Sequence, residues 1–171
     1  MASPGLDLRQ RRLARVGLAL MLLGMWSCAS ARGPAQIDRQ YASPDAAYAA
    51  SVVIPPGYAT VRLAGVIPDP VERSTTIYGD TETQTASVLS KIAVRLRDMG
   101  LSERDVVAMT VYLVAPPPGD TMDYAGMMRA YSRAYGSAAQ PLRPVRSTVQ
   151  VAGLPAGAWV EIEVTAIRPL P

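Results

Sequence analysis

Three charged side chains near the end of the chain are the best candidates for chemistry. Arg146 stands near the start of a run rich in β-branched residues, and Glu161 and Glu163 stand in a second such run. The planar guanidinium of arginine matches a carboxylate, and a glutamate can hold or activate a water molecule. Because charged residues mostly form the solvated side of a sheet, spacing alone leaves both a functional site and an ordinary polar face open.

The two runs are predicted to form an antiparallel hairpin. The segment 154–157, Leu-Pro-Ala-Gly, lies between them, and Pro with Gly between β-branched runs is typical of a turn. Glu161 and Glu163 alternate with apolar residues, which places both on one face of a strand. Arg146 alternates with valines in the first run, so we expect it on a polar face as well.

Five further segments upstream have the patterns of regular structure. They are predicted strands at Tyr48–Ile54, Ala59–Ile67 and Val106–Ala115, and predicted helices at Thr81–Met99 and Thr121–Tyr135. This order predicts an α+β single domain, a mixed β-sheet with two helices packed on one face. The central strand is apolar on both faces, as expected for a strand inside the sheet.

The ends of both helices carry capping residues. Thr81 and Gln84 have the spacing of a capping box, and Gly100 suits the left-handed residue that follows a helix. Asp120 is the predicted N-cap of the second helix. Residues at helical spacing form a stripe on that helix, which we predict to be core rather than a ligand site: Tyr124, Met127, Met128, Tyr131 and Tyr135.

The N-terminal segment 1–27 has the layout of a signal peptide. Four arginines precede an apolar run at 16–26, which is shorter than the ~20 residues that span a bilayer. Cys28, the only cysteine, follows this run after one small residue, Ser27, and resembles the acylated residue of a bacterial lipoprotein, although Met25 and Trp26 depart from that motif. Lipidation, simple secretion and an uncleaved anchor stay open. Residues 28–45 are predicted to be a flexible tether, and residues 46–171 the domain.

Charge and composition exclude several functions. The net charge is +3, but residues 1–27 hold four arginines and one aspartate, so their removal leaves a charge of zero. The pI of about 9.2 therefore gives no support for a nucleic-acid partner. The chain has no histidine, which excludes a histidine metal site and a histidine-based triad.

The C-terminal pattern P-x-R-S-x-V-x-V-x-x-L-P-x-G-x-x-V-E-I-E resembles that of the reactive intermediate deaminase (Rid) family, also called the YjgF family. The resemblance covers about Tyr48 to Ile167 and includes further local matches at Leu63-Ala64-Gly65, Gln84-Thr85 and Asp123-Tyr124. It implies a chorismate-mutase-like fold, a homotrimer with pockets between subunits, and no metal or cofactor.

The resemblance also implies an activity and its residues. The best-known branch hydrolyses 2-imino acids, or their enamine tautomers, to 2-keto acids and ammonia. The arginine that matches Arg146 holds the substrate carboxylate, and the glutamate that matches Glu161 places or activates the attacking water. Gly65 and Tyr48 match further substrate-binding positions, whereas Glu163 matches no site role.

Two positions depart from the family pattern, since Ala64 replaces a serine and Met128 replaces an asparagine. The pocket is therefore expected to be more apolar. One hypothesis is an imine deaminase in the bacterial cell envelope, periplasmic and lipid-anchored, or else secreted. The other is a non-catalytic trimer there that binds a small carboxylate or scaffolds a partner. The sequence leaves open whether Arg146 and Glu161 meet within one chain or across subunits.

Overall fold

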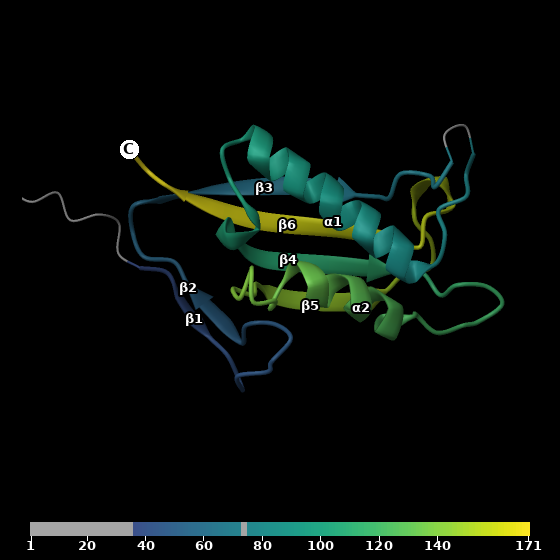
Figure 1. Ribbon diagram of the computed structural model, residues 1–171, viewed down its shortest axis with the longest axis horizontal. Coiled ribbons are helices and arrows are strands. Elements are labelled where there is room, and N and C mark those ends of the chain that lie inside the picture. The colour runs from purple at the N-terminus through teal and green to yellow at the C-terminus, as the bar shows by residue number, and fades with distance from the viewer. Residues whose placement is uncertain (1–35, 73–74) are drawn as a thin grey trace, which may run out of the picture. The chain divides into compact units, whose positions relative to one another are not determined.

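The computed structural model describes residues 36–72 and 75–171 (Figure 1). Its elements are, in chain order, β1 (Asp38–Gln40), β2 (Ser51–Val53), β3 (Tyr58–Val66), α1 (Thr81–Asp98), η1 (Glu103–Asp105), β4 (Val106–Leu113), α2 (Tyr124–Ala134), β5 (Val145–Gln150), η2 (Pro155–Gly157) and β6 (Val160–Pro169). The predicted signal peptide and Cys28 lie outside the described residues. Within the described part, no helix is long and apolar enough to cross a membrane.

The main sheet has four strands in the order β3-β6-β4-β5. β6 is antiparallel to both β3 and β4, whereas β5 is parallel to β4. Both helices lie on the same face of this sheet (Figure 1). The prediction of an α+β domain with a mixed sheet and two helices on one face is confirmed.

The predicted hairpin is wrong, because β5 and β6 do not pair with each other. β4 lies between them and is hydrogen-bonded to both. The connection at 151–159 is long enough to carry the chain past β4 before β6 begins. Turn residues at 154–157 show where the chain bends, but they do not say which strand becomes the neighbour.

The core forms between the helices and the sheet face that they cover. Leu96 of α1, Met127 of α2 and Val111, Leu113 and Val160 of the sheet are all fully buried. β4 is the inner strand that its two apolar faces predicted. Complete burial of such a side chain contributes about 1.5–3 kcal/mol, so this layer holds the helices and their site residues in place.

The two predicted helices are present, but their caps differ from the prediction. Asp80, not Thr81, caps α1, and its Oδ1 accepts a hydrogen bond from the Thr83 N–H at 2.8 Å. Gly100 follows α1 with a φ of 72°, the left-handed conformation predicted for it.

α2 begins three residues later than predicted, with Asp123 as its N-cap instead of Asp120. The Asp123 Oδ1 accepts from the Gly126 N–H at 2.8 Å. Gln150 explains the delay, because its side chain accepts from the Met122 N–H and donates to the Asp120 carbonyl, both at 2.8 Å. These bonds hold the preceding loop outside the helix and tie it to the end of β5.

A small second sheet forms from β1 and β2, which pair antiparallel. β2 lies within the predicted strand Tyr48–Ile54, whereas β1 falls in the stretch predicted to be a tether. The tether prediction is therefore wrong for residues 38–40. Arg39 fixes β1 to the domain, because its Nη2 donates to the carbonyls of Arg104 at 3.0 Å and Val106 at 3.2 Å.

Candidate functional site

Arg146 lies on the edge strand β5 and points toward α2. It pairs in register with Met109, whose side chain is in the core beneath the helices. Its Nη2 donates to the hydroxyl of Tyr124 at 2.7 Å, and its Nη1 contacts the Met128 sulfur at 3.2 Å. The polar face of β5 therefore faces the helix layer, and the sulfur, a weak acceptor, leaves that side of the guanidinium poorly satisfied.

Three tyrosine rings surround the Arg146 guanidinium. Its Cζ lies 4.3 Å from the ring centroid of Tyr131, 5.3 Å from that of Tyr48 and 5.7 Å from that of Tyr124. The electron-rich ring faces stabilise a cation at these distances. Burial raises the pKa of Tyr131 to about 12, although the charge of Arg146 acts in the opposite direction. Tyr131 is therefore neutral at physiological pH.

Several buried polar atoms at this place have no hydrogen-bond partner within the described chain. They are Arg146 Nε, the Tyr131 hydroxyl and the hydroxyl of Thr148, two residues further along the same face of β5. In the described ranges, Arg146 also takes part in no ion pair. Since buried polar groups are normally satisfied, an unpaired cation among unsatisfied groups is typical of a site for an anionic ligand.

Two neighbouring segments bring the other residues of this cluster to β5. The Ala49 N–H donates to the Pro144 carbonyl at 2.9 Å, which places the adjacent Tyr48 over Arg146. Gln150 ties the opposite end of β5 to the loop before α2, as described above. The predicted site residues Tyr48 and Arg146 are therefore brought together, although they are almost a hundred positions apart.

Tyr124 and Met128 correct the prediction that the stripe on α2 is purely core. Met127, Tyr131 and Tyr135 are buried as expected, but Tyr124 is 40% exposed. Tyr124, Met128 and Tyr131 follow one another at helical spacing along the side of α2 that faces Arg146. That spacing was visible in the sequence, but it does not distinguish a side chain that fills the core from one that lines a site.

Glu161 lies on the opposite face of the sheet. It alternates with Val160 and Ile162, which are buried under the helices, and it pairs in register with Tyr112 of β4. Within one chain, Arg146 and Glu161 are therefore separated by the sheet itself. The alternative in which they meet inside a single subunit is excluded by this topology.

Gly65 is the predicted site residue that accompanies Glu161. It lies in the irregular part of β3, where the register with β6 shifts between Leu63 and Val66. A Cβ added at Gly65 would overlap the Glu161 carboxylate oxygen. Only a residue without a side chain lets the carboxylate rest against the backbone here.

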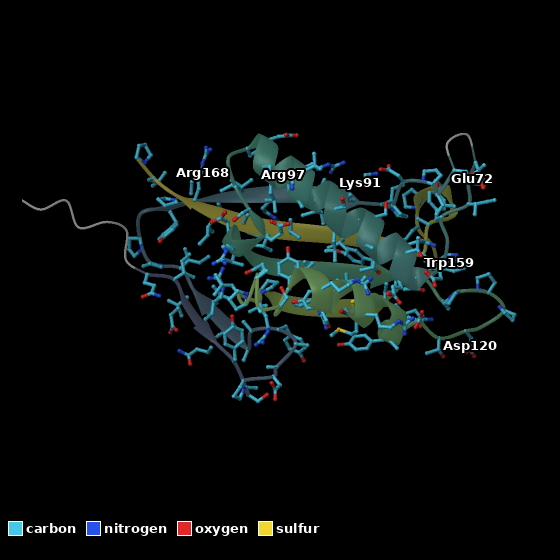
Figure 2. All side chains as sticks on the ribbon, in the orientation of Figure 1. Glu72, Lys91, Arg97, Asp120, Trp159 and Arg168 are labelled. Carbon is cyan, nitrogen blue, oxygen red and sulfur yellow. The ribbon has the colours of Figure 1, made fainter. Side chains whose placement is uncertain are left out.

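The start of β6, and with it Glu161, is fixed by the buried Gln84. Its Oε1 accepts from the Trp159 N–H at 2.7 Å, and its Nε2 donates to the Gly79 carbonyl at 3.0 Å. Figure 2 shows Trp159 beside the first turns of α1. One side chain thus connects the beginning of α1 to the strand that carries the glutamate.

Glu161, Glu163 and Tyr112 share the face of the sheet that the helices leave open. Loss of hydration, followed by the negative charges of Glu163 and Glu161, raises the pKa of Tyr112. Arg62 of β3 lowers it, so a positive charge also lies near this group. The face is a polar cluster that carries both glutamates.

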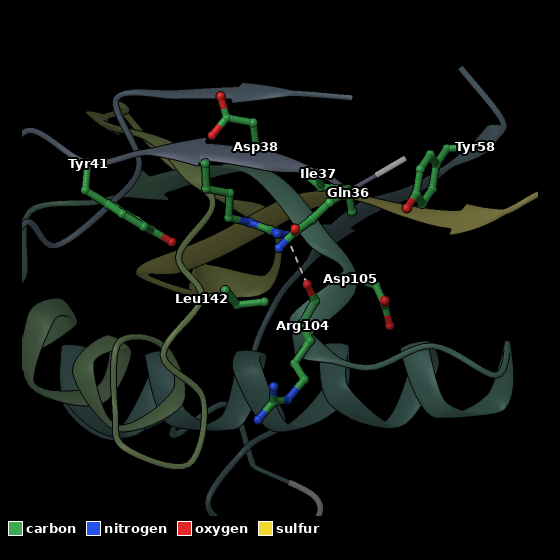
Figure 3. A pocket seen from close by; sticks show the side chains of 9 residues that line it. Gln36, Ile37, Asp38, Tyr41, Tyr58, Arg104, Asp105 and Leu142 are labelled. Carbon is green, nitrogen blue, oxygen red and sulfur yellow. Dashed lines mark hydrogen bonds between the residues drawn. The ribbon is translucent and has the colours of Figure 1, made fainter. Parts of the chain in front are cut away.

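A cavity of about 880 Å³ lies elsewhere, between β1, the start of β3 and η1. Figure 3 shows it, with the dashed line marking the bond from Arg39 to the Arg104 carbonyl. Burial lowers the pKa of Arg39, while the nearby Tyr41 and Asp105 oppose this effect. Arg39 already donates to two backbone carbonyls and so holds β1 in place. We therefore do not take this cavity as the candidate substrate site.

Comparison with known proteins identifies the family. The model of the family described as Endoribonuclease L-PSP matches residues 40–168. A RutC family protein of Pyrococcus abyssi is 35% identical over 108 residues, which are 63% of this chain and 78% of that protein. The Escherichia coli protein TdcF, whose name proposes a reactive intermediate deaminase, is 33% identical over 54% of this chain and 67% of its own length.

Solved structures agree with this comparison. A crystal structure of E. coli TdcF with bound serine superposes with a TM-score of 0.55 and 30% identity, covering 64% of this chain and 81% of TdcF. The match to the family model, at residues 40–168, includes Gly65, Arg146 and Glu161. The chain belongs to the Rid family, whose members are also described as RutC, YjgF and Endoribonuclease L-PSP proteins.

Proposed function

We propose that this protein is a deaminase of 2-imino acids and their enamine tautomers. Arg146 binds the substrate carboxylate, Tyr48 and Gly65 contribute to the substrate site, and Glu161 positions the attacking water. The main support is the unpaired Arg146 cation, which lies among three aromatic rings and beside unsatisfied buried groups. A carboxylate is the ligand that satisfies such a fork through charge-assisted hydrogen bonds.

Water is the only co-substrate that this reaction consumes. Water adds to the imine carbon, the C–N bond of the resulting adduct breaks, and the products are a 2-keto acid and ammonia. Glu161 takes one proton from the attacking water and passes it to the imine nitrogen, which gives a carbinolamine. The remaining hydroxyl proton is then transferred to the nitrogen as the C–N bond breaks, so that the carbonyl forms and ammonia departs. A carboxylate next to the reacting carbon is common to all these substrates, so binding at Arg146 sets the position of that carbon.

The site is proposed to form between two copies of the chain. Because Arg146 and Glu161 lie on opposite faces of one sheet, a site that uses both needs Arg146 of one subunit and Glu161 of the next. The homotrimer with pockets between subunits that the family resemblance implies has this property. The open sheet face with Glu161, Glu163 and Tyr112 is then the surface that meets the neighbouring subunit.

The assay that tests this function generates 2-aminoacrylate and follows the release of pyruvate against the spontaneous rate. We expect the full-length protein to accelerate the release, and Glu161→Gln to lower kcat by about 10²–10⁴-fold, the usual contribution of a general acid-base group. Glu163→Gln is the matched control, since it makes the same change two residues away on the same face. Equal losses in both variants, or no acceleration by the wild type, would contradict the proposal.

A second candidate is a non-catalytic trimer that binds a small carboxylate or scaffolds a partner. The observation that favours it is Met128, which presents a sulfur to Arg146 where the family pattern has an amide. The sequence also has Ala64 where the family pattern has a serine hydroxyl. The bound serine in the TdcF structure is itself a small carboxylate. This candidate predicts thermal stabilisation by carboxylates without turnover in the same assay.

We propose a location in the cell envelope, with Cys28 as the lipidated residue. The support is the sequence pattern of residues 1–28 alone. Metabolic labelling with an alkyne fatty acid tests it, because Cys28→Ser would remove the label if the thiol is the acylated group. In the absence of any label on the wild type, secretion without an anchor becomes the better account.

A further inference from the structure

Tyr124 is the part of the Arg146 cluster to which neither the family resemblance nor the comparisons assign a role. Its hydroxyl oxygen accepts a hydrogen bond from Arg146 Nη2 at 2.7 Å, which is shorter than the 3.2 Å contact from Arg146 Nη1 to the Met128 sulfur. The ring lies 5.7 Å from the guanidinium, at the first position of α2. Tyr124 is also 40% exposed, so it lies on the open side of the cluster.

The hydroxyl proton of Tyr124 is free to bind a ligand. A phenol can accept and donate at the same time. The acceptor side is used by Arg146, and the described residues offer the proton no acceptor. Acceptance from a cation polarises the O–H bond and makes the phenol a better donor.

The guanidinium itself keeps donors for the same ligand. Arginine has five N–H groups, of which one binds Tyr124 and one contacts the weakly accepting sulfur of Met128. A carboxylate has two oxygens. One oxygen can take a remaining N–H of Arg146 while the other takes the Tyr124 proton.

We propose that the Tyr124 hydroxyl is a second binding group for the substrate carboxylate, beside Arg146. This inference rests on the proposed function, because it assumes that Arg146 is the carboxylate-binding residue. A binding role for Tyr124 would also explain how the site can bind a carboxylate with Met128 in place of the asparagine of the family pattern. The hydroxyl supplies a polar contact on the helix side of the pocket, where the amide of the family pattern is missing.

The test compares two ligands that differ only in the carboxylate. Binding of 2-oxobutanoate and of its neutral amide, 2-oxobutanamide, is measured by NMR titration for the wild type and Tyr124→Phe, which keeps the ring. We expect the variant to bind 2-oxobutanoate about 10–100-fold more weakly, the range for one hydrogen bond to a charged group. Binding of the amide should weaken less, by about 2–10-fold, since its neutral carbonyl accepts a weaker hydrogen bond from the phenol than a carboxylate does.

Tyr135→Phe is the matched control, because it removes a hydroxyl from a tyrosine one turn past Tyr131 that is 2% exposed and stacked on that ring. It should bind both ligands as the wild type does. Unchanged or tighter 2-oxobutanoate binding in Tyr124→Phe, or equal weakening for both ligands, would overturn the inference. A wild type that binds no 2-oxobutanoate would overturn it too.

Binding and turnover separate this inference from the deaminase proposal. If wild type binds 2-oxobutanoate and shows the Tyr124 effect but does not accelerate pyruvate release, only the catalytic proposal fails. If it releases pyruvate but Tyr124→Phe binds 2-oxobutanoate normally, only the inference about Tyr124 fails.

Discussion

Replacement of Arg146 by alanine should abolish measurable acceleration of pyruvate release from 2-aminoacrylate. The guanidinium is the unpaired cation of the cluster, and each hydrogen bond to a charged group contributes about 1.5–3 kcal/mol. Loss of two such bonds lowers kcat/KM by about 10²–10⁴-fold. The three tyrosine rings around Arg146 remain in place, so the expected loss is one of substrate binding and orientation rather than of folding.

Two further variants define what Arg146 contributes. Arg146→Lys keeps the charge but loses the planar fork, and we expect it to recover only a small part of the activity. Arg95→Ala removes the same charge from an exposed position on α1 and should behave as wild type. If Arg146→Ala retained the wild-type kcat/KM while folded, the carboxylate would be bound elsewhere and the proposed site would be wrong.

Gly65→Ala is the second substitution with a large expected effect. The new Cβ would occupy the place of the Glu161 carboxylate, which has to rotate away. That carboxylate is the far end of a flexible side chain, so the cost in stability should be small. The cost in rate should be large, because a displacement of about 1 Å from the reacting geometry can lower a rate about 10²-fold.

Gly153→Ala is the control for this prediction. Its added Cβ would meet no atom within 4 Å, so it makes the same chemical change without a collision. We expect Gly65→Ala to melt within a few degrees of wild type while its kcat falls, and Gly153→Ala to match wild type in both measurements. A normal kcat for Gly65→Ala would show that the position of Glu161 against Gly65 does not matter for the reaction.

Periodic patterns were sufficient to predict the class of fold. The stripe of α1, the two apolar faces of β4 and the alternation of β6 each report which side of an element is buried. Each pattern marks the apolar side of a helix or strand, and the layers form because these apolar sides pack against one another. The helix caps were less predictable, because Asp120 and Asp123 are chemically equivalent and only the distant Gln150 decides between them.

Strand order was not predictable from the same signals. The turn at 154–157 is real, but the pairing of β5 with β4 depends on contacts between segments that are distant in sequence. This one feature changes the site, because it turns Arg146 toward α2 and leaves Glu161 on the other face. Spacing along the chain left open an ordinary polar face that carries all three charged residues, whereas the sheet places Arg146 on one face and both glutamates on the other.

The candidate site residues were proposed from the family resemblance, and their contacts could not be predicted from the sequence. Tyr48 reaches Arg146 because the chain next to it bonds to Pro144, and Tyr124 reaches it from α2. Neither contact has a local sequence signal. In contrast, the pairing of Gly65 with Glu161 is the kind of close approach for which a glycine inside a strand is a direct indication.

A mixed assembly of two inactive variants tests most directly whether the site joins two copies. Arg146→Ala and Glu161→Gln are each purified, confirmed to be inactive, and then co-assembled in equal amounts, with mixed oligomers verified by native mass spectrometry. If each site takes Arg146 from one subunit and Glu161 from the next, random mixing in a cyclic assembly restores about a quarter of the wild-type activity. Verified mixed oligomers that stay inactive would contradict a site shared between subunits, and with it the proposed pairing of Arg146 and Glu161.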